Sequence, residues 1–273
     1  NGAGKTTTIR LLLGLLEPTA GQAQVLGLDT RHQADAIRER TGSLLEHHGL
    51  YERLSAEENL EYIGRVNLMS SAERKARIQE LLEHVGLWER RKEKTGTWSR
   101  GMKQKLAVAR ALFHHPQLIF LDEPTAGFDP EAAASLRNDL SEIVSQEGVT
   151  VFVTTHNLSE AEKLCTQVGV IRKGKLMAVG HPDQLRASVG SAQVEVIGEG
   201  FTDRILALLQ AHPDLQSVAQ SQNGRMVLQL NHAARMAPLV RLLVENGAEI
   251  EEIRKGNTSL EDAYLALMEE GEE

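Results

Sequence analysis

The chain has 273 residues, of which 41% are hydrophobic and 25% charged, and its formal net charge is −8. This length fits one large domain with a small one, or two domains, and the composition is that of an ordinary globular protein. The charge argues against a general nucleic-acid-binding protein. Residues 251–273 alone carry eight carboxylates and two basic residues, and such a surface repels phosphate backbones and anionic lipid.

The single cysteine, Cys165, allows no internal disulfide and suits a reducing compartment. No apolar run approaches the roughly 18–20 residues that a membrane-spanning helix needs. If the protein works at a membrane, we therefore expect it to do so through a partner.

Residues 1–7 read Asn-Gly-Ala-Gly-Lys-Thr-Thr and run into an apolar stretch, which predicts a phosphate-binding loop that opens a helix. Glycines let the backbone approach a polyphosphate closely, and the helix N-terminus adds partial positive charge. Lys5 would reach the β- and γ-phosphates, and Thr6 would offer its hydroxyl to Mg²⁺. The alternative is a glycine-rich helix cap with a chance lysine. The full pattern has a further glycine and a strand before Gly2, so we expect the chain to be a fragment that lacks its N-terminus.

Strands and helices alternate along the first two thirds of the chain. The expected helices cover residues 5–16, 34–40, 56–84 with a break near 70–71, 103–114 and 131–146. The expected strands cover residues 22–28, 41–46, 118–121 and 149–154. This alternation predicts an α/β fold with a mostly parallel sheet, whose chemistry lies at the carboxyl ends of the strands.

The order of predicted strands and helices changes after residue 189. The expected order is strand 192–197, helix 202–211, strands 218–220 and 226–230 around a Gln-Asn-Gly turn, helix 233–245 and strand 250–254. This order predicts a small α+β domain of the ferredoxin-like type, closed by a helix over 260–268. We therefore expect a domain over 1–189, with a helical subdomain at about 52–115, and an accessory domain over 190–273.

Adjacent carboxylates follow the buried strand 118–121. Neighbouring side chains at a strand tip diverge, so Asp122 would hold Mg²⁺ through water, and Glu123 would act as general base or orient the attacking water. His156 follows the next strand, where it would contact a γ-phosphate. The alternatives are a solvated acidic turn and a structural histidine.

A second stretch with anion-binding character opens the helix near residue 103. Ser99-Arg100-Gly101-Met102 places a serine and backbone N–H groups at a helix N-terminus, although an ordinary serine cap would look the same. The pairs His47-His48 and His114-His115 lack carboxylate or cysteine partners at ligand spacing, and we interpret them as surface histidines.

The order of these stretches resembles the ATP-binding subunit of an ABC transporter. Residues 1–7 are similar to the Walker A loop, 98–102 to the signature motif, 118–123 to Walker B, 126–129 to the D-loop, and His156 to the switch histidine. The resemblance covers essentially the whole chain and implies a P-loop NTPase fold. The small second domain and the ending over 256–264 look like the exporter branch of daunorubicin and multidrug type.

The resemblance implies an ATPase that drives export through a separate multi-span permease, at the cytoplasmic face of the plasma membrane. Two copies would sandwich two ATP molecules head to tail, with Mg²⁺, and residues 46–51 with the helical insert would receive the permease. Glu123 and His156 would be catalytic, and Thr6, Asp122 and Glu46 would serve the metal. The implied nucleotide-binding residues are Asn1, Gly2, Ala3, Gly4, Lys5, Thr6, Thr7, Ser99, Arg100, Gly101, Met102 and Asp129.

The sequence departs from the family pattern at several points. Glu46 stands where the family usually has a glutamine, and the signature reads Trp-Ser-Arg-Gly-Met in place of Leu-Ser-Gly-Gly-Gln. The aromatic residue that stacks on adenine is absent, so we expect this fragment to bind ATP poorly.

Two further readings are a soluble ABC ATPase acting on DNA ends or ribosomes, and a degenerate cassette that binds nucleotide without turnover. The lack of a coiled-coil insertion or second cassette disfavours the first, and intact Lys5, Asp122, Glu123 and His156 disfavour the second.

Overall fold

The computed structural model describes residues 2–189, 193–221, 224–231, 235–255 and 259–269 of the chain. The chain divides into two compact units, Asn1–Asn157 and Leu158–Glu273. The predicted boundary after residue 189 and the predicted extent of the helical subdomain stay predictions.

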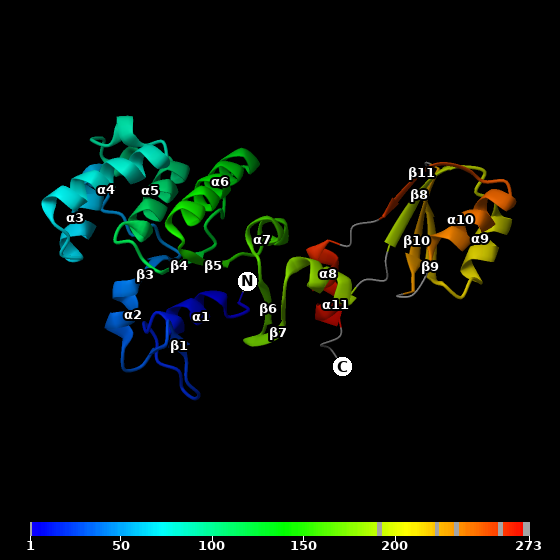
Figure 1. The fold of residues 1–273 in the computed structure, drawn as a ribbon, viewed down its shortest axis with the longest axis horizontal. Coiled ribbons are helices and arrows are strands. Elements are labelled where there is room, and N and C mark those ends of the chain that lie inside the picture. Colours follow the sequence, from blue (N-terminus) through cyan, green and yellow to red (C-terminus); the bar gives the residue numbers. More distant parts are fainter. Residues whose placement is uncertain (1, 190–192, 222–223, 232–234, 256–258, 270–273) are drawn as a thin grey trace. The chain divides into compact units, whose positions relative to one another are not determined.

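A three-stranded parallel sheet lies at the centre of the first unit (Figure 1). Its strands, in the order β3-β4-β5, are β3 (Thr41–Leu44), β4 (Leu118–Asp122) and β5 (Thr150–Thr154). Asp122 pairs in register with Thr154. The carboxyl ends of β4 and β5 therefore meet at one edge of the sheet, as the alternation of elements predicts.

Helices cover both faces of this sheet (Figure 1). They are α1 (Lys5–Leu12), α2 (Ala34–Arg40), α3 (Ala56–Val66), α4 (Ser71–His84), α5 (Arg100–Leu112) and α6 (Pro130–Glu147), with short 3₁₀ turns η1 (Trp88–Arg90) and η2 (Thr95–Thr97). The central strand β4 is buried on both sides. Ile119 and Leu121 pack in the core formed with α3 to α6, and Phe120 packs against Ile9 of α1 and Ile37 of α2. This alternation makes the unit a three-layer α/β sandwich.

The break predicted near residues 70–71 is confirmed, because α3 ends at Val66 and α4 begins at Ser71. Ser55 and Ser70 start these two helices, and each forms a capping box with the glutamate three residues later. The two helices of the insert are therefore separated by local capping chemistry.

The first predicted helix and the first predicted strand differ from the structure. Helix α1 ends at Leu12, before the expected residue 16, because Gly14 takes a left-handed φ of 63° close to the backbone of Thr30. The predicted single strand 22–28 is a hairpin of β1 (Gln24–Val25) and β2 (Leu28–Asp29). Leu26 and Gly27 form its turn with φ values of 52° and 78°, the left-handed geometry of tight hairpins.

The second unit begins with a helix and a hairpin. These elements are α7 (Leu158–Leu164), β6 (Val168–Arg172), β7 (Lys175–Gly180) and α8 (Pro182–Val189). The antiparallel β6–β7 pair was not predicted; it turns at Lys173 and Gly174, which both have positive φ. The last helix, α11 (Leu260–Glu269), packs against α7 and α8, and Leu260 is buried in their core.

The rest of the second unit is a four-stranded antiparallel sheet with two helices. Its elements are β8 (Gln193–Glu199), α9 (Asp203–Gln210), β9 (Leu215–Ser221), β10 (Arg225–Leu230), α10 (Met236–Glu245) and β11 (Glu249–Lys255). The sheet order is β11-β8-β10-β9, and both helices pack their apolar sides into one core. The predicted ferredoxin-like order is confirmed. Residues 222–223 of the predicted turn and 233–234 of the predicted helix lie outside the described residues.

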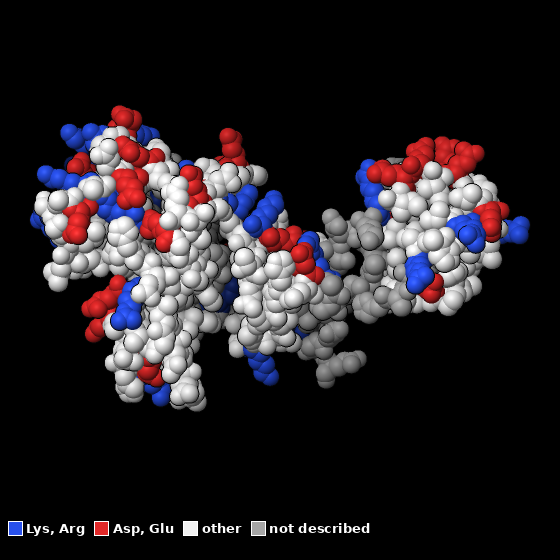
Figure 2. Space-filling view, in the orientation of Figure 1, with Lys and Arg blue, Asp and Glu red and all other residues white. Residues whose placement is uncertain are grey.

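Charge is unevenly spread over this small sheet. Figure 2 shows Asp and Glu side chains gathered near the end at which β8 and β11 are labelled in Figure 1. Glu199 and Glu249, which are exposed, pair directly across these two strands. The predicted lack of a nucleic-acid partner stays a prediction. Among the described residues, no helix is long and apolar enough to cross a bilayer.

Candidate functional site

The glycine-rich loop at the start of the chain bends through two left-handed residues. Gly2 and Gly4 have φ values of 83° and 106°, which side-chain-bearing residues rarely adopt. Gly4 occupies the N-cap position of α1, and no side chain caps this helix end. The N–H groups of the first turn therefore remain available to an anion, as the sequence predicts.

Thr6 in the first turn of α1 contacts the tip of strand β4. Its hydroxyl donates to one carboxylate oxygen of Asp122 over 2.6 Å, and the hydroxyl of Thr154 on β5 donates to the other. The Asp122 residue is only 6% exposed. Hydrogen bonds from two distant segments of the chain, α1 and β5, therefore fix this carboxylate. Thr154 was not among the predicted site residues.

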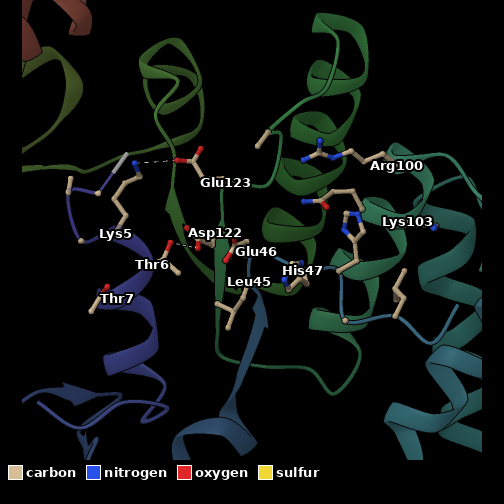
Figure 3. A pocket seen from close by; sticks show the side chains of 18 of the residues that line it. Lys5, Thr6, Thr7, Leu45, Glu46, His47, Arg100, Lys103, Asp122 and Glu123 are labelled. Carbon is tan, nitrogen blue, oxygen red and sulfur yellow. Dashed lines mark hydrogen bonds and ion pairs between the residues drawn. The ribbon is translucent and has the colours of Figure 1, made fainter. Parts of the chain in front are cut away.

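Glu123 turns away from Asp122 and towards the glycine-rich loop (Figure 3). One of its oxygens lies 3.3 Å from Nζ of Lys5. The other lies 2.7 Å from Nδ1 of His156 and accepts the His156 backbone N–H over 3.2 Å. The predicted divergence of the two carboxylates is confirmed. Lys5, Glu123 and His156, from three separate segments, form one contiguous cluster.

The backbone of Glu123 has a φ of +50°. A left-handed conformation at a residue with a side chain costs on the order of 1–3 kcal/mol and persists only where the surroundings enforce it. The side chain is nevertheless 23% exposed and faces a cavity. A strained carboxylate that is aimed into a cavity is typical of a functional group.

The cavity beside these residues has a volume of about 790 Å³, within the range of small-molecule sites. Figure 3 shows Lys5, Thr6, Asp122 and Glu123 on one side of it and Arg100 on the other. Its lining combines the glycine-rich loop, the segment after β3, the start of α5 and the end of β4. The site therefore offers lysine and backbone N–H groups for a polyphosphate and carboxylates for a metal or a water.

Comparison with known proteins identifies the chain. The family model described as ABC transporter matches residues 1–126. Bacitracin transport ATP-binding protein BcrA of Bacillus licheniformis is 36% identical over 268 residues, which is 98% of this chain and 86% of BcrA. Daunorubicin resistance ATP-binding protein DrrA3 of Streptomyces coeruleorubidus is 34% identical over 271 residues, 98% of this chain and 84% of DrrA3. The chain belongs to the ABC transporter ATP-binding proteins.

Solved structures of ABC ATP-binding proteins have the same fold. A structure described as the ATP-binding subunit of an ABC transporter matches with a TM-score of 0.60 and 32% identity over 69% of this chain and 78% of its own. CbiO1 from Clostridium perfringens, part of the complex cbiONQ, matches with a TM-score of 0.63 and 27% identity over 68% of this chain and 76% of its own. The predicted P-loop NTPase fold and ATPase activity are thus confirmed for this ABC protein.

The structure brings most of the predicted site of this ABC ATPase into one cavity. The predicted residues that line it are Gly2, Ala3, Gly4, Lys5, Thr6, Thr7, Glu46, Arg100, Asp122 and Glu123. Asn1 lies outside the described residues. Ser99, Gly101, Met102, Asp129 and His156 are not among the lining residues, although His156 contacts Glu123.

Two of the predicted nucleotide-binding residues act as helix caps within this chain. Ser99 accepts the N–H of Met102 at the start of α5, and Asp129 accepts the N–H of Ala132 at the start of α6. Any contact with nucleotide therefore stays a prediction for both. Glu46 has a side chain that is 69% exposed and lies 3.8 Å from Arg10, and its metal role also stays a prediction.

The interpretation of His48 and His114 as surface histidines is wrong. Both are half-buried, and His48 lines the cavity. Burial lowers the pKa of His48, and the positive charges of Arg100 and Lys103 lower it further, while a hydrogen bond with Gln104 raises it. No local motif signals these positions, because their neighbours come from distant segments: Gln104 of α5 for His48 and the Thr41 carbonyl of β3 for His114.

Proposed function

We propose that this ATPase drives export of a substrate through a separate multi-span permease, and that two copies close over two ATP molecules. The observation that carries the proposal is the cluster of Lys5, Glu123 and His156 beside the Thr6–Asp122 pair. Two relatives with most of their length matched carry names of bacitracin transport and daunorubicin resistance. We propose on this basis a peripheral location at the cytoplasmic face of the plasma membrane.

The residues at the end of β4 suit a magnesium ion that accompanies ATP. The Thr6 hydroxyl and the Asp122 carboxylate lie 2.6 Å apart and are hard oxygen donors of the kind that Mg²⁺ prefers. In the part of the chain that is described, no group of three or more His, Cys, Asp or Glu side chains could hold a metal alone. The ion would therefore share its ligands with phosphate oxygens and water. When bound, it neutralises phosphate charge during transfer.

The chain's own residues divide the work of hydrolysis between binding and proton transfer. The loop N–H groups and Lys5 bind the polyphosphate, since Gly2 and Gly4 open the backbone towards the cavity. Glu123 orients a water molecule and accepts its proton as the water oxygen bonds to the γ-phosphorus, while the bond from that phosphorus to the β–γ bridging oxygen breaks and ADP leaves. His156 holds the Glu123 carboxylate through Nδ1, at 2.7 Å, and completes the contacts around the γ-phosphate.

A second copy supplies the remaining donors. Ser99 and Gly101 open α5 but do not line the cavity of their own chain. This placement supports a head-to-tail dimer in which the α5 N-terminus of one protomer faces the nucleotide bound by the other.

Glu123→Gln in the full-length protein with its permease tests the proposal. We expect turnover to fall by about 10²-fold or more, because the amide cannot accept a proton, while ATP affinity stays within about twofold. Glu83→Gln is the matched control, since Glu83 is exposed on α4 and accepts a hydrogen bond from Gln79. Turnover is measured by phosphate release and affinity by calorimetric titration.

The same variant tests dimer formation. With ATP bound and hydrolysis slowed, light scattering should report a mass that corresponds to two ATPase protomers in each complex with the permease. Unchanged turnover would contradict the role of Glu123, and a monomer under these conditions would contradict the proposed assembly.

A further inference from the structure

Gln104 is a polar side chain in the buried face of α5. The residue is 6% exposed, whereas the other buried residues of this helix are apolar. Its Nε2 donates to the backbone carbonyl of Pro124 over 2.6 Å. A carbonyl only accepts, so the amide nitrogen must face Pro124, and the amide oxygen remains for the hydrogen bond with His48.

Pro124 directly follows the strained residue Glu123. A residue before proline favours extended backbone, yet Glu123 has a φ of +50°. Hydrogen bonds to backbone groups hold this turn in place. The N–H of Glu123 donates to the carbonyl of Thr154 over 2.9 Å, and the N–H of Ala126 donates to the carbonyl of Glu123 over 3.1 Å. A further bond comes from the side chain of Gln104.

The Gln104 bond joins the turn to α5, a separate element that packs in the same core as the end of β4. Of the two backbone bonds, one joins the turn to β5 and the other lies within the turn, so neither depends on where α5 lies. Helix α5 begins next to Ser99, whose hydroxyl caps it. The N-terminus of α5 and the carboxylate of Glu123 are thus connected through one buried side chain.

We propose that Gln104 is a positioning residue of ATP hydrolysis, which rests on the proposed role of Glu123 as the base. Its hydrogen bond holds the Glu123–Pro124 peptide in the strained conformation that directs the Glu123 carboxylate towards Lys5 and His156. The orientation of α5 thereby sets the orientation of the base. Loss of the bond lets the backbone relax and moves the carboxylate away from its partners.

Gln104→Leu in the full-length protein with its permease tests this inference. We expect kcat to fall by about tenfold or more, since a misplacement of about 1 Å at a reacting group has effects of this size or larger. Gln104 lines the same cavity as the glycine-rich loop, but its hydrogen bond goes to the Pro124 carbonyl and not to that loop. ATP affinity should therefore stay within about twofold. Gln146→Leu is the matched control, since Gln146 is exposed on α6 and bonds to Glu142.

A double-mutant cycle with Glu123→Gln separates positioning from general destabilisation. If Gln104 acts through Glu123, Gln104→Leu should change the residual turnover of Glu123→Gln by less than about twofold. An equal loss in both backgrounds, or a parallel loss of ATP affinity, would overturn the inference. All rates are measured well below the thermal midpoint of each variant.

Gln104→Glu provides a second variant of the same size, in case the leucine variant does not fold. At pH 8 an ionised glutamate has no donor for Pro124, so its kcat should also fall by about tenfold. Full kcat in Gln104→Glu would contradict the inference. If instead Glu123→Gln keeps full turnover, Glu123 is not the general base and the proposed function is contradicted. Normal kcat in both Gln104 variants beside an inactive Glu123→Gln defeats this inference alone.

Discussion

Two cation–carboxylate pairs in the first unit have the same chemistry and different settings. Lys5 lies 3.3 Å from Glu123, and the two side chains are 20% and 23% exposed. Arg77 forms two bonds of 2.8 Å with Glu147, and its side chain is 2% exposed. The guanidinium of Arg77 also donates to the carbonyl of Leu112 over 2.8 Å.

The Arg77 pair belongs to the fold, whereas the Lys5 pair belongs to the site. Arg77 joins α4 to the ends of α5 and α6, and its donors are matched by fixed acceptors. Lys5 has a carboxylate partner on a strained residue beside a cavity, so a phosphate oxygen can replace that partner at little cost. A buried ion pair whose hydrogen-bond donors all have protein acceptors holds helices together. An ion pair beside a cavity, with donors still open to a ligand, can exchange its protein partner for that ligand.

Arg77→Met should produce the largest loss of stability. We expect the free energy of unfolding to fall by about 3 kcal/mol, because Glu147 loses its partner and buried carbonyls lose their donor. Arg65→Met is the control, since Arg65 pairs with Glu61 on the exposed face of α3 and its loss should change stability by less than about 0.5 kcal/mol.

Urea unfolding followed by circular dichroism measures both variants. Turnover per folded molecule of Arg77→Met should match that of the parent protein. Equal stability of the Arg77 and Arg65 variants would contradict the structural role of the buried pair.

Lys5→Met should show the opposite profile. We expect this substitution to lower the free energy of unfolding by less than about 1 kcal/mol. Glu123 keeps its bond to His156, and the side chains of Lys5 and Glu123 are both partly exposed to solvent. ATP affinity should fall by about tenfold or more, since the variant loses a charged donor worth roughly 1.5–3 kcal/mol.

Lys75→Met, at an exposed position of α4, is the matched control for Lys5→Met. The test combines urea unfolding with calorimetric titration of ATP. If Lys5→Met unfolds as readily as Arg77→Met, the distinction between the two pairs is wrong.

The sequence predicts the site wherever a short local pattern determines it. Gly2 and Gly4 next to Lys5 predict the loop, and the apolar run before Asp122 predicts a strand that ends there. The serine and the glutamate of each capping box also lie only three residues apart, at the start of α3 and of α4. The signals in these cases lie within a few residues, because capping and strand burial are local effects.

The contacts that complete the site are long-range, and the sequence does not reveal them. Thr154 reaches Asp122 across 32 positions and Gln104 reaches Pro124 across 20, so both bonds depend on how whole elements pack. Arg77 and Glu147 are 70 positions apart. The histidines were misjudged for the same reason, because burial of His48 and His114 follows from packing rather than from neighbouring residues.

The smallest predicted effect concerns His114, which lies in the neighbourhood of the Arg77 pair. Burial lowers the pKa of His114, the positive charges of His115 and Arg77 lower it further, and the hydrogen bond to the Thr41 carbonyl opposes them. Its Nδ1 is buried and, among the described residues, has no hydrogen-bond partner. A proton added there would be both unsatisfied and close to other cations.

The sign of the pH effect follows from this lowered pKa. The unfolded chain takes up the proton near the ordinary value of 6.5, whereas the folded protein takes it up only at lower pH. The stabilisation from neutral His114 is therefore complete above about pH 6.5 and is lost as pH falls towards the folded pKa. His114→Gln keeps a donor for Thr41 and has no charge to gain.

We expect His114→Gln to lose less stability than the parent protein between about pH 7.5 and 5.5, by a few tenths to about 1 kcal/mol. Burial also lowers the pKa of His48, so the unfolding free energy of the variant should still depend on pH in this range, although less steeply. His32→Gln, at an exposed position, is the control for the substitution itself. An identical pH dependence of the unfolding free energy in His114→Gln and the parent protein would show that the imidazole beside Arg77 is not held neutral. The region around the Arg77–Glu147 pair would then accept an added charge as readily as the Lys5 site does.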